Sequence, residues 1–248
     1  MNAASHIKTI AKRELSAYFN SPVAYVFIVI FLLLAGFFTF MAGGFFERGE
    51  ASLISFFLWH PWLYLFLVPA VGMRLWSEER RLGTMELLLT MPITSWQAIV
   101  GKFLASWGFL ALALLLTFPV WITVNYLGNP DNGVIIGGYL GSFLLAGAYL
   151  AISSMTSAVT RNQVVSFILS VVICLFLILA GWPPVTRLLD QVSESPRLVE
   201  AVAAFSVMTH FEGFQKGALE SRDFVFFVAV IVFSLFTTSV IIRSHRAG

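Results

Sequence analysis

The side chains that could take part in acid–base or ionic chemistry are concentrated in residues 74–102, RLWSEERRLGTMELLLTMPITSWQAIVGK, between long apolar runs. Charges of both signs at this density can form ion pairs with one another or with a charged partner. Apolar residues lie between the charges, so we interpret the stretch as a helical loop in water with an apolar face left for a partner. The seven charged residues are Arg74, Glu78, Glu79, Arg80, Arg81, Glu86 and Lys102.

The patterns that usually accompany covalent catalysis or cofactor binding are missing. Gly101-Lys102 lacks the earlier glycine and the Ser/Thr of a phosphate-binding loop, and no HExxH or GxSxG motif occurs. The single cysteine, Cys174, lies in an apolar run and excludes an intrachain disulfide. We therefore expect no catalytic residue, no metal ion and no cofactor bound by this chain. The four histidines show no ligand spacing: His6, His60, His210 and His245.

The composition indicates a membrane protein. Hydrophobic residues make up 58% of the 248 residues and charged residues 11%, and the mean hydropathy is +0.87. A soluble domain has about 25% charged residues, and one domain of this length could not bury so much apolar surface. The net charge of +2 gives no reason to expect nucleic acid as a partner. No repeat or linker divides the chain, so residues 1–248 are expected to form a single transmembrane domain.

Six uncharged runs are each long enough to cross a bilayer as a helix, which needs about 20 residues. Lipid leaves only helices or closed barrels as spanning structures, and these runs are too long for barrel strands. The sequence therefore predicts an all-α polytopic membrane protein with six transmembrane helices and both termini on one side. The runs are residues 21–46, 51–73, 103–130, 132–160, 162–186 and 224–242.

Lysine and arginine predict which side each loop faces. With the N-terminus in the cytoplasm, the inner segments hold ten of these residues and the outer segments five. Positive charge in loops is in excess on the cytoplasmic side of a membrane, so we expect both termini in the cytoplasm. None of the six runs contains a carboxylate, which argues against a proton- or sodium-coupled carrier.

Residues 1–21 are expected to contain a helix that lies along the inner headgroups. Within residues 5–19, apolar residues fall on one arc, and polar residues such as Lys12 and Arg13 fall opposite. Ser21-Pro22 then turns the chain into the bilayer. Glu14 breaks the pattern because it lies within the apolar arc. It either snorkels or pairs with a nearby lysine, or it contacts a cytoplasmic subunit.

The central loop is predicted to hold a short helix between two breaks. Gly83 ends the first helical piece, and Thr84 can cap the next one, with Glu86 favourable in its first turn. That piece, MELLLTM at residues 85–91, ends before Pro92. A loop built in this way is a stiff lever joined to two membrane spans.

The helix that leads into the third run also has a defined start, because Thr94-Ser95-Trp96-Gln97 matches a capping box. Leu82, Met85 and Leu89 share one face of the loop. Two interpretations of this face stay open: it rests on lipid headgroups, or it docks in the groove of a soluble protein.

Two of the apolar runs carry features of their own. The second run contains Pro61 and Pro69, which should bend its helix. It also contains His60, for which the position favours an interfacial histidine facing water over a functional ionisable group. The fourth run contains rows of small residues, such as Gly137 and Gly141, which favour close packing within the chain over an oligomer interface.

The last part of the chain is predicted to contain a hairpin and an outer segment. The short turn at residues 160–162 should join the fourth and fifth spans as antiparallel neighbours. Residues 183–222 contain two short apolar stripes separated by Pro196, which indicates amphipathic or re-entrant helices at the outer interface.

Three stretches resemble the type-2 ABC exporter permease family: KRELSAYFNSPVAY at 12–25, PWLYLFLVPAVGMRLWSEERRLGTMELLLTMPITSWQAIVGKF at 61–103, and SRDF at 221–224. The resemblance extends over nearly the whole chain. Its most specific part is the central order of EE, GT, E-LLL, PI and GK. Within the family, the chain is most similar to the branch named for the gliding-motility permease GldF.

The resemblance implies a connecting helix at the N-terminus, a coupling helix between spans two and three, and a re-entrant element between spans five and six. Two permease copies would sit on a dimer of cytoplasmic ATP-binding subunits, which would bind the ATP, in a bacterial inner membrane. The connecting helix would include Lys12, Arg13 and Glu14. The coupling loop would include Glu78, Glu79, Gly83, Thr84, Met85, Glu86, Leu87, Leu88 and Pro92.

Two functions stay open at this point. The chain is either the permease subunit of an ATP-driven exporter or remodelling complex, or a scaffold that transmits ATP-driven motion to an outer partner and moves no solute. In the GldF branch, a membrane-anchored protein of the GldG type with a large outer domain is usually part of the assembly, and the small outer segment here would leave room for it. The missing catalytic and pore-lining charges disfavour an intramembrane enzyme or an ion channel.

Overall fold

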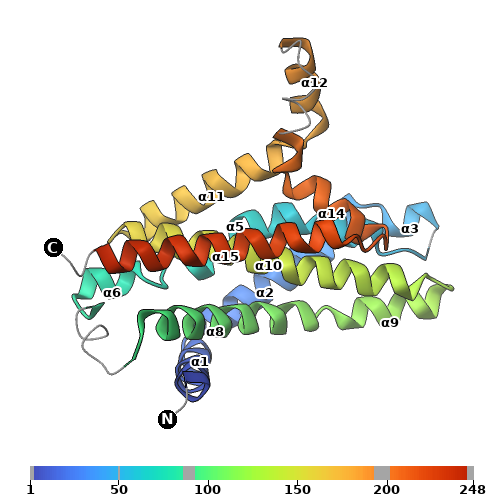
Figure 1. Cartoon of the computed structure of the whole chain (residues 1–248). Coiled ribbons are helices and arrows are strands. Elements are labelled where there is room, and N and C mark those ends of the chain that lie inside the picture. Colours follow the sequence, from blue (N-terminus) through green and yellow to red (C-terminus); the bar gives the residue numbers. More distant parts are fainter. Residues whose placement is uncertain (1–2, 50, 86–92, 193–201, 245–248) are drawn as a thin grey trace.

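The computed structural model describes residues 3–49, 51–85, 93–192 and 202–244. Every regular element in these ranges is a helix (Figure 1), which confirms the predicted all-α class. In chain order they are α1 (Ala3–Phe19), α2 (Pro22–Phe37), the short π-helical segment η1 (Phe38–Ala42), α3 (Phe45–Arg48), α4 (Ile54–Leu58), α5 (His60–Gly72), α6 (Ser77–Leu82), α8 (Ser95–Leu115), α9 (Phe118–Leu127), α10 (Asn132–Val159), α11 (Gln163–Leu179), α12 (Pro183–Val192), α14 (Val207–Gln215) and α15 (Ser221–Ser244).

Among the described residues, four helical stretches are long and apolar enough to cross a membrane. The predicted second run is divided between α4 and α5, and the predicted fifth run forms α11, an apolar helix of 17 residues. At 1.5 Å per residue α11 is about 25 Å long, slightly less than a hydrocarbon core of about 30 Å. The count of six spans therefore stays a prediction. The four stretches are Pro22–Glu47, Ser95–Leu127, Asn132–Val159 and Ser221–Ser244.

The second apolar run is interrupted between α4 and α5. Pro61 lies in the first turn of α5, where its missing N–H costs no helical hydrogen bond, whereas Pro69 lies inside α5 without ending it. His60 is 0% exposed, and its ring packs against Phe56 with 4.5 Å between ring centroids. The prediction that His60 faces water is therefore wrong, because the interrupted helix places its ring in a cluster of aromatic side chains inside the bundle.

The centre of the bundle is α10, which contacts α5, α8, α11, α14 and α15. Of its most apolar 18 residues, 78% are buried, against 22% for the stretch that contains α2. Small residues allow these contacts, because a side chain at Gly138 would strike Phe57 and one at Gly141 would strike Phe214. The small-residue rows therefore serve packing within the chain, as predicted.

The helices after residue 132 include the predicted hairpin and the short helices that follow it. α10 and α11 pack as neighbours, and Asn162 in the turn between them caps α11 by accepting from the N–H of Val164. Cys174 on α11 is buried. α12 projects away from the bundle, whereas α14 returns to it and contacts α10 and α15 (Figure 1). Part of the second predicted apolar stripe falls in residues 193–201, outside the described residues.

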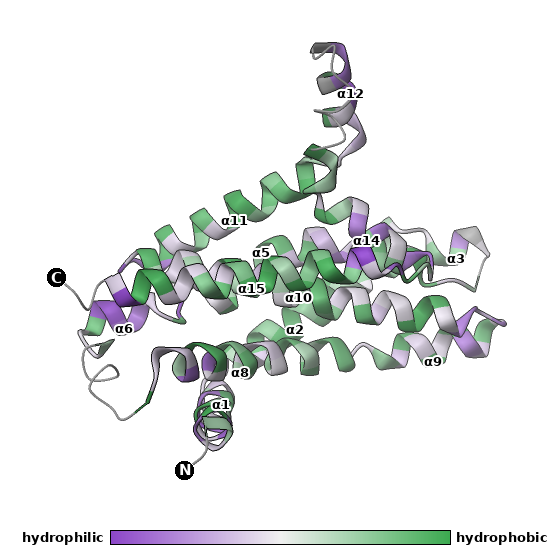
Figure 2. Cartoon of the chain, in the orientation of Figure 1, coloured by the Kyte–Doolittle hydropathy of each residue, from purple (hydrophilic) through white to green (hydrophobic). Residues whose placement is uncertain are grey.

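Polar residues mark the two ends of the bundle. α6, the first turns of α8 and the last turns of α15 lie at one end, called here the α6 end, and α3 and the α9–α10 turn lie at the other, the α3 end (Figure 1). Figure 2 shows hydrophobic residues along the middle of α8, α10, α11 and α15, and hydrophilic residues at α6. α1 lies across the bundle near the α6 end, as expected for a helix along a membrane surface.

Candidate functional site

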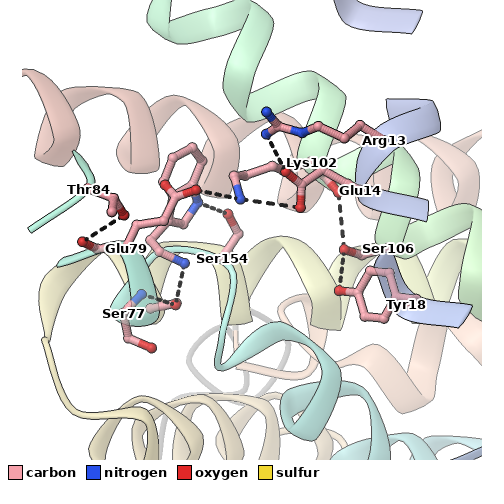
Figure 3. A network of polar contacts seen from close by, with 11 residues as sticks. Arg13, Glu14, Tyr18, Ser77, Glu79, Thr84, Lys102, Ser106 and Ser154 are labelled. Atoms are coloured by element: carbon pink, nitrogen blue, oxygen red, sulfur yellow. Dashed lines mark hydrogen bonds and ion pairs between the residues drawn. The ribbon is translucent and has the colours of Figure 1, made fainter. Parts of the chain in front are cut away.

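Lys102 on α8 joins three helices at the α6 end (Figure 3). Its ammonium nitrogen lies 2.9 Å from a carboxylate oxygen of Glu79 on α6 and 3.5 Å from one of Glu14 on α1. Arg13 pairs with the same Glu14 at 2.7 Å. Lys102 is only 6% exposed. We call Lys102, Glu14 and Glu79 the Lys102 junction, because one buried cation there holds two carboxylates that are far apart in the sequence.

The surroundings of the Lys102 junction are buried, so its stability requires both the cation and the carboxylates. The Lys102 ammonium lies 5.5 Å from the centre of the Trp76 ring, within reach of a cation–π interaction. Oxygen Oε2 of Glu79 is buried without a hydrogen-bond partner among the described residues. Removing one partner from such a buried group would leave an uncompensated charge, which is strongly unfavourable.

α1 crosses α8 at very close range. A Cβ atom at Gly101 on α8 would lie 2.7 Å from Cγ2 of Ile10, so a larger residue at this position would push α1 away. Ile10 belongs to the apolar arc predicted for residues 5–19. The amphipathic pattern therefore marks the face of α1 that packs on α8.

Tyr18 adds an aromatic contact and a buried hydrogen bond between the same two helices. Its ring stacks on Phe109 with 5.1 Å between ring centroids, and its hydroxyl lies 2.9 Å from Oγ of Ser106. Ser106 donates to the carbonyl of Lys102, so Tyr18 donates to Ser106. Burial raises the pKa of Tyr18 to about 12. The hydroxyl therefore remains a donor at physiological pH.

Serine side chains attach the start of α6 to the last turns of α10. Nε1 of Trp76 donates to Ser154 at 3.0 Å, and the backbone N–H groups of Trp76 and Ser77 both donate to Oγ of Ser157 at 3.0 Å. Ser157 donates in turn to the carbonyl of Met73 at 2.9 Å. These bonds fix α6 to the central helix of the bundle.

Arg80 makes a further contact with α10. Its guanidinium donates to the carbonyl of Ala158, one residue before α10 ends. The last carbonyls of a helix lack intrahelical partners and carry partial negative charge, so a cation is favourable there. Burial lowers the pKa of Arg80, and the positive charge of Arg161 lowers it further.

The predicted break after α6 is present. Gly83 has φ of +71°, a left-handed conformation that favours glycine, and the N–H of Thr84 bonds back to the carbonyl of Glu79 at 3.0 Å. Leu82 is 62% exposed, whereas Met85 is 7% exposed and belongs to the core. Of the apolar face predicted for the loop, Leu82 is therefore open and Met85 is covered.

The predicted coupling helix extends into residues 86–92, which lie outside the described residues. The assignment of Glu86, Leu87, Leu88 and Pro92 to the coupling loop stays a prediction. The capping box that follows is confirmed: the N–H of Gln97 donates to Thr94 Oγ1 at 3.4 Å, the N–H of Thr94 donates to the Gln97 side chain at 3.0 Å, and α8 starts at Ser95.

The structure brings together only part of the predicted site. Glu14 and Glu79 meet at Lys102, and of the interpretations of Glu14 the ion pair is observed, although with a lysine of another helix. Lys12 is exposed and does not reach the junction. Glu78 lies 3.9 Å from Arg81, in an exposed pair.

The family follows from comparison with known proteins. The model of the family described as ABC-2 family transporter protein matches residues 8–194, which include most of α1 and the whole of α6, α8 and α10. The chain belongs to the ABC-2 transporter family. No curated protein matches the sequence. The predicted family is thus confirmed, and the narrower GldF-like branch stays a prediction.

Membership in the ABC-2 family has three general consequences. Proteins of this family are membrane components of ABC transporters, they generally have no nucleotide site of their own, and they normally work with a cytoplasmic ATPase. The long apolar helices agree with a membrane protein. Within the described residues, no three His, Cys, Asp or Glu side chains gather closely enough to hold a metal ion.

A second buried charge pair of this ABC-2 protein was not predicted from the sequence. Nδ1 of His210 on α14 lies 2.7 Å from a carboxylate oxygen of Asp223 on α15, and Nε2 lies 3.0 Å from the carbonyl of Ala204. Both neighbours are acceptors when Asp223 is ionised, so the ring must donate through both nitrogens, as only the imidazolium can. The ring also stacks on Phe226 at 4.1 Å.

The central role of Lys102 was also missed. The available signal was Glu14, whose carboxylate lies on an apolar arc and therefore needs a cation when that arc is buried. The sequence could not indicate which cation, because Lys102 meets Glu14 only where α1 crosses α8. The serines of α10 gave no signal either, since neutral polar residues are ordinary in packed spans.

Proposed function

We propose that this ABC-2 protein is the permease subunit of an exporter-type complex in the bacterial inner membrane. It crosses the membrane six times, with α4–α5 and α11 as the two spans beyond the four long helices, and both termini are cytoplasmic. A separate cytoplasmic ATPase dimer binds and hydrolyses ATP, and the α6 end faces it. The excess of Lys and Arg predicted for the inner segments supports this orientation.

The observation that carries the proposal is the Lys102 junction. It ties α1, α6 and α8 together through ion pairs, and serine bonds tie α6 to α10. A force on the loop after α6 would therefore reach the surface helix and two membrane helices at once. ATPase contact would involve Gly83 and Thr84 with the loop residues Glu86, Leu87, Leu88 and Pro92, and the connecting-helix residues Lys12 and Arg13.

The complex would contain a second copy of this chain and, at the α3 end, a membrane-anchored partner of the GldG type. The described outer elements, α12 and α14, are short, which leaves that side open for a separate outer domain. The alternative function is a scaffold that passes ATPase motion to this outer partner and moves no solute. The predicted membrane runs contain no charged residues, so the sequence shows no charged path for a solute and no site for a coupled ion. This observation supports the scaffold alternative.

Contact with the ATPase is tested by Glu86→Lys and Leu88→Asp in the full chain, expressed together with its ATPase. Both variants should reach the membrane at the wild-type level and retain at least about tenfold less ATPase on purification, a loss of about 1.4 kcal/mol of binding free energy. Glu220→Lys, an exposed change before α15, is the matched control and should retain the ATPase. Wild-type retention by both loop variants would refute the coupling role.

Transport and mechanical transmission are separated with the whole complex in lipid vesicles. An exporter should show ATPase stimulation and ATP-dependent uptake with at least one candidate substrate. A scaffold should show ATPase stimulation only when the outer partner is present, and no uptake. The variants Glu86→Lys and Leu88→Asp should abolish either form of stimulation.

A further inference from the structure

A cleft of about 430 Å³ opens beside the Lys102 junction, between α1, α2, α5 and α6. Small and apolar side chains of three helices line its inner part, including Ala17, Ala24, Phe27, Ala70 and Val71. Its charged lining comes from α1, α6, α8 and the residues just before α6. The charged residues are Glu14, Arg74, Glu78, Glu79 and Lys102.

The charges of the cleft divide into satisfied and unsatisfied groups. Glu14, Glu79 and Lys102 neutralise one another, with Arg13 as an additional cation. Arg74 makes no hydrogen bond or ion pair within the described residues. Glu78 has only a long contact of 3.9 Å with the exposed Arg81. One guanidinium and one carboxylate, four residues apart, are therefore available at the mouth of an apolar cleft.

The position of the cleft restricts the ligand. α2 and α5 are apolar, and α1 has the pattern of a helix at the lipid headgroups. The inner part of the cleft thus lies at acyl-chain depth and its mouth at headgroup depth. A ligand that fills it must be apolar at one end and carry both a positive and a negative charge at the other.

We propose that the cleft binds a phospholipid with a primary ammonium headgroup, as in phosphatidylethanolamine. Its phosphate accepts hydrogen bonds from Arg74, and its ammonium donates to Glu78, which lines the cleft and has only the long contact with Arg81. One acyl chain lies along Phe27 and Ala70. The lipid would brace α1 against α5 and α6, and the proposal does not depend on the ATPase partner.

The headgroup chemistry predicts a selectivity order. Phosphatidylglycerol offers the phosphate but no cation, so it leaves Glu78 unpaired. Phosphatidylcholine offers a cation without N–H donors, so it loses the hydrogen bonds to the carboxylate. We expect the ethanolamine lipid to bind about tenfold tighter than either, since it alone combines a phosphate acceptor with charged N–H donors.

The test is native mass spectrometry of the purified full chain, titrated with the three lipids carrying identical acyl chains. Arg74→Gln should weaken all three, Glu78→Gln should abolish only the preference for ethanolamine over glycerol, and Ala70→Phe should block the cleft to all. Arg222→Gln and Glu220→Gln are matched controls at the α3 end and should change nothing. Melting temperatures without added lipid should stay close to wild type, which excludes loss through unfolding.

The position of the bound acyl chain is measured by cross-linking with an ethanolamine lipid that carries a photoreactive group on that chain. Cross-links should map to the peptides containing Phe27 and Ala70 and should fall in Ala70→Phe. Equal binding of the three lipids, a preference unchanged in Glu78→Gln, or an affinity unchanged in Arg74→Gln would overturn the proposal. Cross-links confined to the exposed faces of α11 and α15 would overturn it as well, since they would show only the general lipid shell.

Discussion

The Lys102 junction and the His210–Asp223 pair are both buried charge clusters, but they join the chain in different ways. Lys102 connects α1, α6 and α8, which come from three separate parts of the sequence. His210 and Asp223 connect α14 and α15, which follow one another. Loss of the first cluster would release long-range contacts, whereas loss of the second would loosen one local hairpin.

The two clusters also differ in how their elements are held elsewhere. α6 is attached to α10 by the bonds of Trp76 and Ser77 to Ser157, and α1 packs closely on α8 at Gly101. We therefore interpret the α6 end as a fixed joint. The contact between α14 and α15 is held by the ion pair and by the stacking of His210 on Phe226.

The largest effect is expected from Lys102→Met. It leaves the partly buried carboxylate of Glu79 without its cation and Glu14 with only the exposed Arg13, and breaking a buried pair in this way costs about 3–5 kcal/mol. We expect low yield and a strongly lowered melting temperature in detergent. Lys216→Met is the matched control, because its pair with Glu212 is exposed and contributes about 0–1 kcal/mol.

A double variant shows whether the loss comes from charge. Lys102→Met with Glu79→Gln removes a positive and a negative charge together, so it should recover part of the stability lost in Lys102→Met alone. If the stability losses of the two single variants simply add in the double variant, Lys102 acts through packing. The Lys102 junction would then not be a charge cluster comparable with the His210–Asp223 pair.

The second effect is expected from Asp223→Asn. An amide cannot replace the charged acceptor of the His210 imidazolium, and a hydrogen bond to a charged group contributes about 1.5–3 kcal/mol. The loss should be local: hydrogen exchange should rise in α14 and at the start of α15, and stay unchanged in α1 and α6. Exchange that rises equally at both ends would contradict the separation of the two regions.

The comparison also explains what sequence could and could not predict. Capping residues and breaks were predictable because they act locally: Ser21, Gly83 and Thr94 lie where the sequence places them. The apolar arc of α1 and the rows of small residues on α10 were predictable because helical periodicity shows which face of a helix is buried. The helix that packs against each face was not predictable, since it depends on which helices meet in the folded chain.

The wrong and missing predictions concern contacts between distant parts of the chain. His60 was placed in water because histidine near a predicted span end suggests an interface, but the interruption between α4 and α5 depends on tertiary packing. The junction was half visible, since Glu14 indicated a buried charge and only the crossing of α1 and α8 supplies Lys102. The His210–Asp223 pair left no pattern, because two single residues thirteen apart carry no periodicity.

The third prediction compares two glycines that lie beside the two clusters. Gly101→Ala would press on Ile10 and separate α1 from α8, and overpacking of this kind costs about 1–3 kcal/mol. Gly213→Ala would press on Asp223 and disturb the other pair. Gly108→Ala, also on α8 but with open space around it, should be neutral or stabilising by up to about 1 kcal/mol.

These variants are distinguished by amide hydrogen exchange, which shows in which helix protection is lost. Gly101→Ala should raise exchange in α1, and Gly213→Ala should raise it in α14. If Gly101→Ala and Gly108→Ala give the same melting temperature, the close crossing of α1 and α8 does not contribute to stability, and the account of the α6 end as a fixed joint has to be abandoned.

The smallest effect at neutral pH is expected from Tyr18→Phe, which keeps the stack on Phe109 and removes only the bond to Ser106. One such hydrogen bond contributes about 0.5–1.5 kcal/mol. The variant becomes informative at high pH, because burial raises the pKa of Tyr18 from 10.0 to about 12. A raised pKa means that the folded state favours the protonated hydroxyl, so this stabilisation is complete below pH 10 and is lost as the pH rises towards 12.

Tyr18→Phe should therefore be slightly less stable than wild type at neutral pH and lose less stability between pH 10 and 12. Tyr126→Phe, at a residue that is 90% exposed, is the control for the general effect of alkaline pH and should follow the wild-type curve. Melting curves of the three proteins in the same detergent give the comparison. Parallel alkaline losses in all three would mean that Tyr18 is accessible to water, so that α1 would be held less tightly than the Lys102 junction requires.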